Sequence, residues 1–381
     1  MGDTLHVLTI APFYPSERDD ASGCFIAEPL RALEKFDVES SAIVVRPFYA
    51  GKVKPNPSAP AEWLRYFSFP SGVGLSSAGA FLFARLLSKV RKLHSAKPID
   101  IIHAHGPLPA GHAATLLSRE MGIPFVITVH GLDAYSTKQV SGFAGRWCER
   151  MCSHIYSSAK NVICVSEHVR EKVLEKVHCQ TVVVYNGVDS ELFSPAPGNE
   201  IKPIVLSIGN LIPTKGHALL LHAIAIGNSH YPEISCEIIG EGPERAALER
   251  LAKGLNIAHK VHFRGRVNRK EVAAAMRRCA VFALPSRYEA LGCVYLEAMS
   301  SAVPVIGCRG QGIEEIIEHG RNGWLTSTEN PDELALAITT LLENGEQQKT
   351  MRLAARRTIL KSLTLAHQAK RLRDVYEAAL A

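Results

Sequence analysis

Long apolar runs are absent from the sequence, so we expect no membrane-spanning helix. The most apolar later stretch, residues 78–87, is interrupted by Arg85 and is far shorter than the ~20 residues that a membrane span needs. The N-terminal segment has no basic leader, and its apolar run covers only residues 5–10. We therefore expect this segment to form a first strand and not a signal peptide.

Patterned cysteines are also absent. The nine cysteines include no Cys-x-x-Cys pair and no metal-type spacing, which predicts reduced thiols in a cytosolic protein without a metal site. With 46% hydrophobic and 21% charged residues the chain can bury a core, so disorder is not expected. A net charge of +6 suits a protein that handles anionic small molecules or touches an acidic surface. We expect no nucleic-acid partner.

Short β-branched runs alternate with longer amphipathic ones, which predicts an α/β fold with parallel sheets. The length of 381 residues fits two domains of ~180 residues each. In the second half, helices are expected from residue 331 to the end, with a break near residues 344–345. The expected strands cover residues 5–10, 41–46, 101–105, 125–129, 162–165, 181–185, 204–208, 236–239, 261–264, 281–284 and 304–306.

A linker is predicted at residues 193–200, which contain two prolines and one glycine. It divides a domain at 1–192 from a domain at 201–360, and a last helix at 361–381 is expected to pack back on the first domain. Open parallel sheets bind ligands at the carboxyl ends of their strands. Two doubly wound, Rossmann-like domains that face each other therefore predict a ligand cleft between them.

The strongest cluster of candidate residues covers positions 284–299, where a strand, a loop and a helix follow one another. A helix that starts near Gly292 offers backbone N–H groups and a partial positive charge to a diphosphate. Glu289 in the loop and Glu297 in the helix could hold hydroxyls at two ends of one ligand, such as a sugar and a ribose. The alternative is a charged helix entry with Glu297 on a solvated face.

A second cluster covers residues 207–216, where a strand ends and Lys215 precedes a glycine and a helix. Lys215 could neutralise a phosphate leaving group, although the segment lacks the spacing of a Walker A motif. The alternative is a solvated lysine at a helix entry.

A third cluster lies in the first half. His130 follows a strand in residues 129–133 and can donate or accept a hydrogen bond there. His103 and His105 share one face of another strand, so they could bind a metal or, as strand-end histidines usually do, find backbone partners. Gly23 follows the first strand and could begin a loop that closes over phosphates.

Acidic residues are absent between Glu62 and Asp100, and residues 78–97 form a basic amphipathic pattern. Such a helix could make a peripheral contact with an anionic membrane surface. The alternative is an ordinary helix whose apolar side faces the core.

In this order the motifs resemble those of glycosyltransferase family 4, and the resemblance covers nearly the whole chain. It implies the GT-B fold and a hexosyltransferase-type enzyme that keeps the anomeric configuration of the sugar. It further implies a nucleotide-diphosphate sugar as co-substrate, UDP- or GDP-linked, with no metal and no cofactor. The matching segments are the loop at residue 23 and residues 128–133, 165–167, 186–189, 208–216, 263–267, 289–297 and 310–315.

The resemblance also implies roles for single residues. Glu289 would bind hydroxyls of the sugar, and Glu297 would bind the ribose. Lys215 would contact the diphosphate together with backbone N–H groups around Leu291 and Gly292. Glu289, Lys215 and a histidine of the first domain are thus the expected catalytic residues.

That histidine is His130, which would line the sugar pocket, while Arg266 and Val267 would meet the base. Many relatives have an arginine at the position of Asn210, where it binds the diphosphate. Asparagine at this position is expected to mark a subfamily in which Lys215 makes a larger contribution to diphosphate binding. Arginines that could compensate are Arg264, Arg266, Arg287 and Arg309.

The acceptor implied by the resemblance is a glycan or a polyprenyl-linked sugar of a polysaccharide-assembly pathway, met in the cytoplasm or at the inner face of the cell membrane. Two alternatives remain. One is a nucleotide-sugar 2-epimerase of similar build, which would need no acceptor. The other is a non-catalytic partner that binds a nucleotide sugar or another transferase, which only Asn210 favours.

Overall fold

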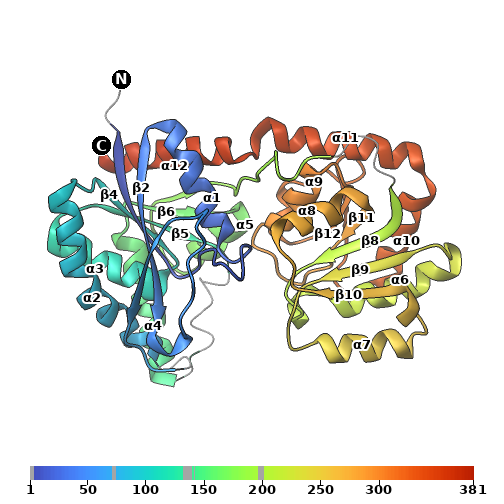
Figure 1. The fold of residues 1–381 in the computed structure, drawn as a ribbon, viewed down its shortest axis with the longest axis horizontal. Helices are drawn as coiled ribbons and strands as arrows, with labels where there is room; N and C mark the ends of the chain where they lie inside the picture. Colours follow the sequence, from blue (N-terminus) through green and yellow to red (C-terminus); the bar gives the residue numbers. More distant parts are fainter. Residues whose placement is uncertain (1–3, 71–73, 132–139, 141, 196–200) are drawn as a thin grey trace. The chain divides into compact units, whose positions relative to one another are not determined.

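A computed structural model describes residues 4–70, 74–131, 140, 142–195 and 201–381. The chain divides into two compact units. Unit 1 comprises residues 1–186 and 365–381, and unit 2 comprises residues 187–364. Each unit is a parallel sheet covered by helices, as Figure 1 shows. The predicted fold class is therefore confirmed.

The unit boundary lies earlier than the predicted boundary at residue 192. Val188 donates its N–H to the Leu363 carbonyl at 3.0 Å, which ties residues 187–192 to unit 2. Phe193 is fully buried there, and its carbonyl accepts a hydrogen bond from Ser300 at 2.7 Å. The predicted linker at 193–200 was thus wrong for its first residues. Burial of the Phe193 side chain holds this segment in unit 2 in spite of the prolines that suggested a linker. Residues 196–200 lie outside the described residues.

The sheet of unit 1 has seven parallel strands in the order β3-β2-β1-β4-β5-β6-β7. The central strands are mostly runs of buried apolar residues, as parallel strands covered on both faces require. The edge strand β3 was not predicted, because its residues are mostly exposed or half-buried and show no apolar run. The strands are β1 (Leu5–Ala11), β2 (Val38–Pro47), β3 (Glu62–Tyr66), β4 (Ile101–His105), β5 (Phe125–Val129), β6 (Asn161–Cys164) and β7 (Thr181–Val183).

The last helix of the chain, α12 (Leu365–Leu380), belongs to unit 1 and begins four residues after the predicted start at 361. Its residues Leu372 and Tyr376 share the core of unit 1 with Ile26 and Leu30 of α1. The other helices of unit 1 are α1 (Cys24–Leu33), α2 (Leu75–Ala96), α3 (His112–Met121), α4 (Gly142–Ser158) and α5 (Glu167–Leu174).

The sheet of unit 2 has six parallel strands in the order β10-β9-β8-β11-β12-β13. The three-residue edge strand β13 was not predicted, because so short a run carries no pattern. The strands are β8 (Lys202–Ile208), β9 (Ser235–Ile239), β10 (Val261–Gly265), β11 (Cys279–Ala283), β12 (Val305–Cys308) and β13 (Trp324–Thr326). The helices are α6 (His217–His230), α7 (Arg245–Gly254), α8 (Arg269–Arg278), α9 (Cys293–Ser300), α10 (Pro331–Glu343) and α11 (Gly345–Ser362).

Each sheet has a switch point, the place where the strand order reverses direction. It lies between β1 and β4 in unit 1 and between β8 and β11 in unit 2. Loops that leave neighbouring strands in opposite directions leave a crevice at the carboxyl edge, where open α/β sheets bind ligands. The loops after these four strands are therefore the first place to look for a site.

Helix α2 covers most of residues 78–97, for which a membrane contact and an ordinary core-facing helix were the two alternatives. Its apolar stripe, which includes Leu82, Leu86 and Val90, is buried in unit 1. The stripe is thus not available to a membrane, and the core-facing alternative holds for it. In the part of the chain that the structure describes, none of the helices combines the length and apolar composition that a membrane crossing requires.

Candidate functional site

The switch point of unit 2 brings two predicted catalytic residues together. Lys215 lies in the loop after β8, and Glu289 lies in the loop after β11. The Lys215 Nζ atom donates to Glu289 Oε2 at 2.6 Å, and both side chains are mostly buried. Seventy-four residues separate them in the chain, so only the adjacency of β8 and β11 makes the pair.

Backbone contacts fix the two loops against each other. Arg287 donates its N–H to the Thr214 carbonyl at 2.8 Å. Gly216 has φ +72°, and a Cβ atom there would stand only 2.0 Å from the Pro285 carbonyl oxygen. Because any side chain would push the loops apart, glycine at 216 is needed to hold Lys215 beside Glu289.

Gln311, in the loop after β12, holds the backbone of Glu289 in place. The Glu289 N–H donates to Gln311 Oε1 at 2.9 Å, and the Gly312 N–H donates to the Glu289 carbonyl at 2.9 Å. A Cβ atom on Gly312 would lie 1.8 Å from the Ala290 carbonyl oxygen, so this contact also requires glycine. The sequence placed Gln311 in a matching segment, but its residue type alone indicated no role.

Leu291 and Gly292 lie in the same loop as Glu289, directly before α9. Gly292 has φ +85° and precedes the first helical residue, Cys293, so the helix begins where the sequence predicted. Leu291 is buried. The first N–H groups of α9 therefore follow directly on the loop that carries Glu289.

Glu297 lies inside α9 and forms a buried ion pair with Arg269. The Arg269 Nη1 atom donates to Glu297 Oε1 at 2.7 Å, and each side chain is 10% exposed. Burial raises the pKa of Glu297, and the charge of Arg269 opposes that rise. The alternative of a solvated Glu297 was wrong.

The remaining predicted residues of unit 2 follow β8 and β10. Asn210 is exposed, and its carbonyl accepts the Ile212 N–H at 2.9 Å. Arg266 is exposed, and Val267 is half-buried. Gly240 connects the two loops, since its N–H donates to the Gly265 carbonyl at 2.9 Å and a Cβ on it would lie 1.9 Å from the Gly209 carbonyl oxygen.

Two of the arginines considered as substitutes for an arginine at 210 are engaged elsewhere. Arg264 binds Glu237 at 3.0 Å, and Arg309 binds Glu333 at 2.7 Å. Arg287 remains as a candidate for a phosphate contact.

His217 is a further residue that the sequence did not single out. It is the first residue of α6 and is fully buried. Burial, together with the charge of Lys215, lowers the pKa of His217 to about 4. A neutral His217 therefore lies behind the loop that carries Lys215. In the sequence, only the position of His217 directly after Gly216 could have indicated a role for this residue.

Helix α1, which Gly23 precedes, contacts His130 in unit 1. Gly23 has φ +72° at the start of α1, and a Cβ atom there would lie 2.5 Å from the backbone of Phe13 and Tyr14. The Phe25 ring, two residues later, packs on the His130 ring at a centroid distance of 4.8 Å. Residues 132 and 133 of the predicted His130 segment lie outside the described residues.

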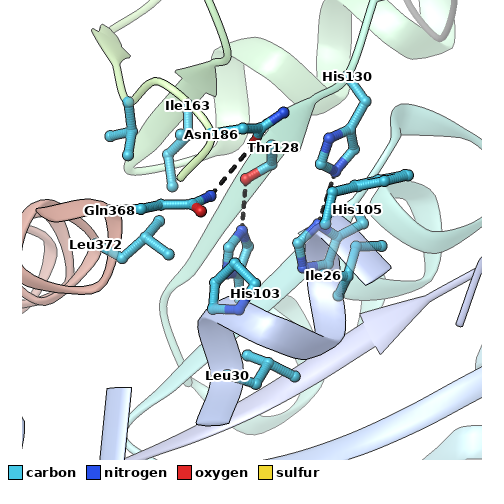
Figure 2. A pocket seen from close by; sticks show the side chains of 13 residues that line it. Ile26, Leu30, His103, His105, Thr128, His130, Ile163, Asn186, Gln368 and Leu372 are labelled. Carbon is cyan, nitrogen blue, oxygen red and sulfur yellow. Dashed lines mark hydrogen bonds between the residues drawn. The ribbon is translucent and has the colours of Figure 1, made fainter. Parts of the chain in front are cut away.

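A pocket beside His130 is lined by His103, His105 and Thr128, as Figure 2 shows. Burial, and then the positive charge that His130 can carry, lowers the pKa of His103 to about 3. Burial also holds the pKa of His105 well below its ordinary value. The described residues contain no cluster of three or more His, Cys, Asp or Glu side chains with the geometry of a metal site.

Two Rossmann-like units with loops of this kind are the architecture of the GT-B fold. Residues 189–358 match the family model for glycosyl transferases group 1, and residues 30–192 match the model for Glycosyltransferase Family 4. An uncharacterized glycosyltransferase of Methanocaldococcus jannaschii is 32% identical over 254 residues, which cover 66% of this chain and 68% of that protein. The chain belongs to glycosyltransferase family 4.

Solved structures share the fold at low identity. Sucrose-phosphate synthase from Thermosynechococcus elongatus matches with a TM-score of 0.80 and 19% identity over 98% of both chains. The Anabaena protein HepE in complex with UDP matches with a TM-score of 0.76 and 20% identity over 98% of this chain and 99% of that one.

Proposed function

We propose that this glycosyltransferase moves a hexose from a UDP- or GDP-linked sugar with retention of configuration and without a metal ion. The observation that carries the proposal is the pair of Lys215 and Glu289, 2.6 Å apart at the switch point of unit 2. A cation for the diphosphate and a carboxylate for sugar hydroxyls stand side by side there.

In the transfer, the bond between the sugar C1 and the diphosphate oxygen breaks, and C1 bonds to the acceptor oxygen on the same face. Negative charge develops on the diphosphate, where Lys215 and the first N–H groups of α9 stabilise it. The acceptor oxygen attacks C1 directly, so no carboxylate acts as nucleophile, and the departing phosphate oxygen takes the acceptor proton. Glu289 accepts hydrogen bonds from sugar hydroxyls.

Thermal unfolding with UDP, GDP, UDP-glucose and GDP-mannose, in EDTA or in magnesium, tests the nucleotide part. A ligand at a hundred times its dissociation constant stabilises the folded protein by ~2.7 kcal/mol. We expect the unfolding temperature to rise with nucleotides of one base only, and this rise to persist in EDTA. Because the similar Anabaena structure holds UDP, we expect that base to be uracil. Lys215→Met should lose about half of the shift or more, and Lys253→Met, on the exposed side of α7, should keep all of it. A shift only with magnesium contradicts metal independence.

Retention is tested separately by proton NMR of the product, because the coupling constant of its anomeric proton reports the configuration. An axial linkage from an axially linked sugar nucleotide supports the proposal, and an inverted product contradicts it. Isomerised sugar nucleotide in the absence of any acceptor would instead indicate an epimerase.

We further propose that the acceptor is glycan-like and lipid-linked, and that unit 1 reaches it by docking on an anionic membrane through an exposed aromatic cluster. The Phe67 ring stands at the centre of this cluster, 5.6 Å from Phe48 and 5.0 Å from both Phe69 and Phe81. Exposed contiguous apolar patches usually mark binding surfaces. The five aromatic side chains are 39% to 51% exposed and are Phe48, Tyr49, Phe67, Phe69 and Phe81.

Charge supports a membrane as the occupant. Residues 40–99, which contain the cluster, hold nine Lys and Arg residues and one acidic residue, Glu62. Aromatic rings insert at the level of lipid headgroups, and basic side chains attract anionic lipids. The proposed membrane contact is thus made by the exposed aromatic rings, and not by the apolar stripe of α2, which is buried.

Co-sedimentation with phosphatidylglycerol or phosphatidylcholine vesicles tests this contact. We expect binding to the anionic vesicles, weakened by salt, and a roughly tenfold loss of binding in a Phe67→Ser, Phe69→Ser double variant, because buried apolar area drives the insertion. Phe143→Ser on α4, where the ring is 77% exposed outside the cluster, should bind as the unchanged protein does. Equal binding by the double variant contradicts the assignment.

A further inference from the structure

Arg269 is a buried cation of unit 2 that the proposed reaction does not use. It is the first residue of α8, where a capping box fixes the backbone. The Asn268 side chain accepts the Glu271 N–H at 3.0 Å, and the Glu271 side chain accepts the Asn268 N–H at 3.1 Å. Val267, a predicted contact of the base, stands only two residues earlier in the chain. The start of α8 therefore follows directly on the loop that was predicted to meet the base.

Two contacts hold the guanidinium of Arg269. Its Nη1 atom donates to Glu297 Oε1 at 2.7 Å. Its central carbon stands over the Phe193 ring, 4.9 Å from the centroid, where the face of an aromatic ring attracts a cation. Phe193 is itself anchored, because its side chain is fully buried and its carbonyl accepts a hydrogen bond from Ser300 on α9 at 2.7 Å. The contacts thus run from α9 through Arg269 and Phe193 back to α9, which limits how far the guanidinium can turn.

The position of Glu297 suits the ribose of a nucleotide whose diphosphate lies at the start of α9. The first helical residue is Cys293, so Glu297 lies about one helical turn, ~6 Å, further along the axis. Helical side chains lean toward the N-terminus, which brings the carboxylate back toward the diphosphate. In a nucleoside diphosphate the ribose is bonded to the inner phosphate. Its hydroxyls therefore come within reach of a carboxylate at this distance.

The Glu297 carboxylate can accept more hydrogen bonds than it does. Among the described residues, Arg269 is the only donor to it, whereas an ionised carboxylate offers about four acceptor positions. Burial raises the pKa of Glu297, and the charge of Arg269 opposes that rise. An ionised carboxylate only accepts hydrogen bonds, which suits hydroxyl groups as donors. Without the guanidinium, the carboxylate would shift toward its protonated form and would lose its fixed direction.

We propose that Arg269 is a positioning residue for ribose recognition, which is held on the Phe193 ring and binds one oxygen of Glu297 so that the other accepts from a ribose hydroxyl. The nucleotide site of unit 2 consequently prefers ribonucleotides to 2′-deoxyribonucleotides. This inference rests on the proposed nucleotide-sugar substrate and assigns to Arg269 a role in binding that substrate.

The dissociation constants of UDP and 2′-deoxy-UDP, measured by isothermal titration calorimetry, test the preference. We expect the unchanged protein to bind UDP about tenfold or more tightly than 2′-deoxy-UDP, because the missing hydroxyl leaves a buried charged acceptor without its donor. GDP and 2′-deoxy-GDP are used instead if the thermal shifts select guanine. Equal constants overturn the inference and leave the proposed function standing. A protein that binds none of the four nucleotides contradicts the proposed function and the inference with it.

Two variants then test the role of Arg269. Arg269→Met keeps most of the stem but removes the charge and the donors, so the preference for UDP should fall to about threefold or less. Arg269→Lys keeps the charge without the planar guanidinium, so it is the variant to use if Arg269→Met does not fold. Its preference should fall about threefold or more. An unchanged preference in the folded variants, or equal weakening of both nucleotides, overturns the inference.

Arg277→Met is the matched control on the same helix. Arg277 donates to the carbonyls of Leu192 and Ser194 at 2.7 and 3.0 Å, so it anchors the chain beside Phe193. In the part of the chain that the structure describes, it makes no contact with Glu297. Arg277→Met should therefore lower the free energy of unfolding and keep the full preference for UDP. A loss of preference equal to that of the Arg269 variants would reduce Arg269 to a structural anchor and overturn the inference.

Discussion

Replacing Gly216 by alanine tests how the loops of unit 2 build the site. A residue other than glycine at φ +72° carries about 1–2 kcal/mol of backbone strain. The new Cβ would also lie 2.0 Å from the Pro285 carbonyl oxygen, and relieving such overpacking costs about 1–3 kcal/mol more. We therefore expect a loss of about 2–5 kcal/mol in the free energy of unfolding of unit 2.

Gly320→Ala is the matched control, because Gly320 has φ +80° in the same unit and nothing lies within 4 Å of a Cβ there. It should cost only the strain, about 1–2 kcal/mol. Of the three tryptophans, only Trp324 lies in unit 2, so its fluorescence in a Trp63→Phe, Trp147→Phe background follows the urea unfolding of that unit. Equal losses in the two alanine variants would refute the close loop contact, and Gly216→Ala should also weaken nucleotide binding.

Two further predictions concern pH and Gln311. Burial lowers the folded-state pKa of His103 to about 3 and of His217 to about 4, below the ordinary 6.5. As the pH falls, the unfolded chain binds protons before the folded protein does. The free energy of unfolding is therefore full above pH 6.5 and falls below that pH by about 1.4 kcal/mol per pH unit for each histidine. Urea unfolding midpoints that agree at pH 7.5 and 5.5 would contradict this. Gln311→Leu should lower turnover about fivefold, because the Glu289 N–H loses its acceptor, and Gln311→Glu should restore it.

The central strands could be predicted because parallel strands buried on both faces are continuous apolar runs. Strands β4 and β5 have the predicted bounds. The edge strands β3 and β13 carry no such signal, since one side of each faces solvent or the run is only three residues long. Pro195 and nearby residues suggested a linker from 193, yet burial of Phe193 drew that segment into unit 2.

The sequence indicated the candidate residues in separate clusters, but it did not indicate which residues they contact. Lys215 and Glu289 come from loops whose strands are neighbours only in space, so their ion pair depends on the strand order. Glu297 has its partner on a different helix, where no pattern around residue 297 points to Arg269. The contact of His105 with His130 likewise needs the pairing of β4 with β5.

Binding and turnover measured together on Lys215→Met and Glu289→Gln test the central claim most directly. With the nucleoside diphosphate that stabilises the protein, Lys215→Met should bind roughly 10- to 100-fold more weakly, because a charge-assisted contact is lost. Glu289→Gln should bind the same diphosphate within about threefold and yet lose most turnover, because it contacts the sugar and not the phosphate. Near-normal turnover in Glu289→Gln, or unchanged diphosphate binding in Lys215→Met, would contradict a sugar-nucleotide site at the switch point of unit 2.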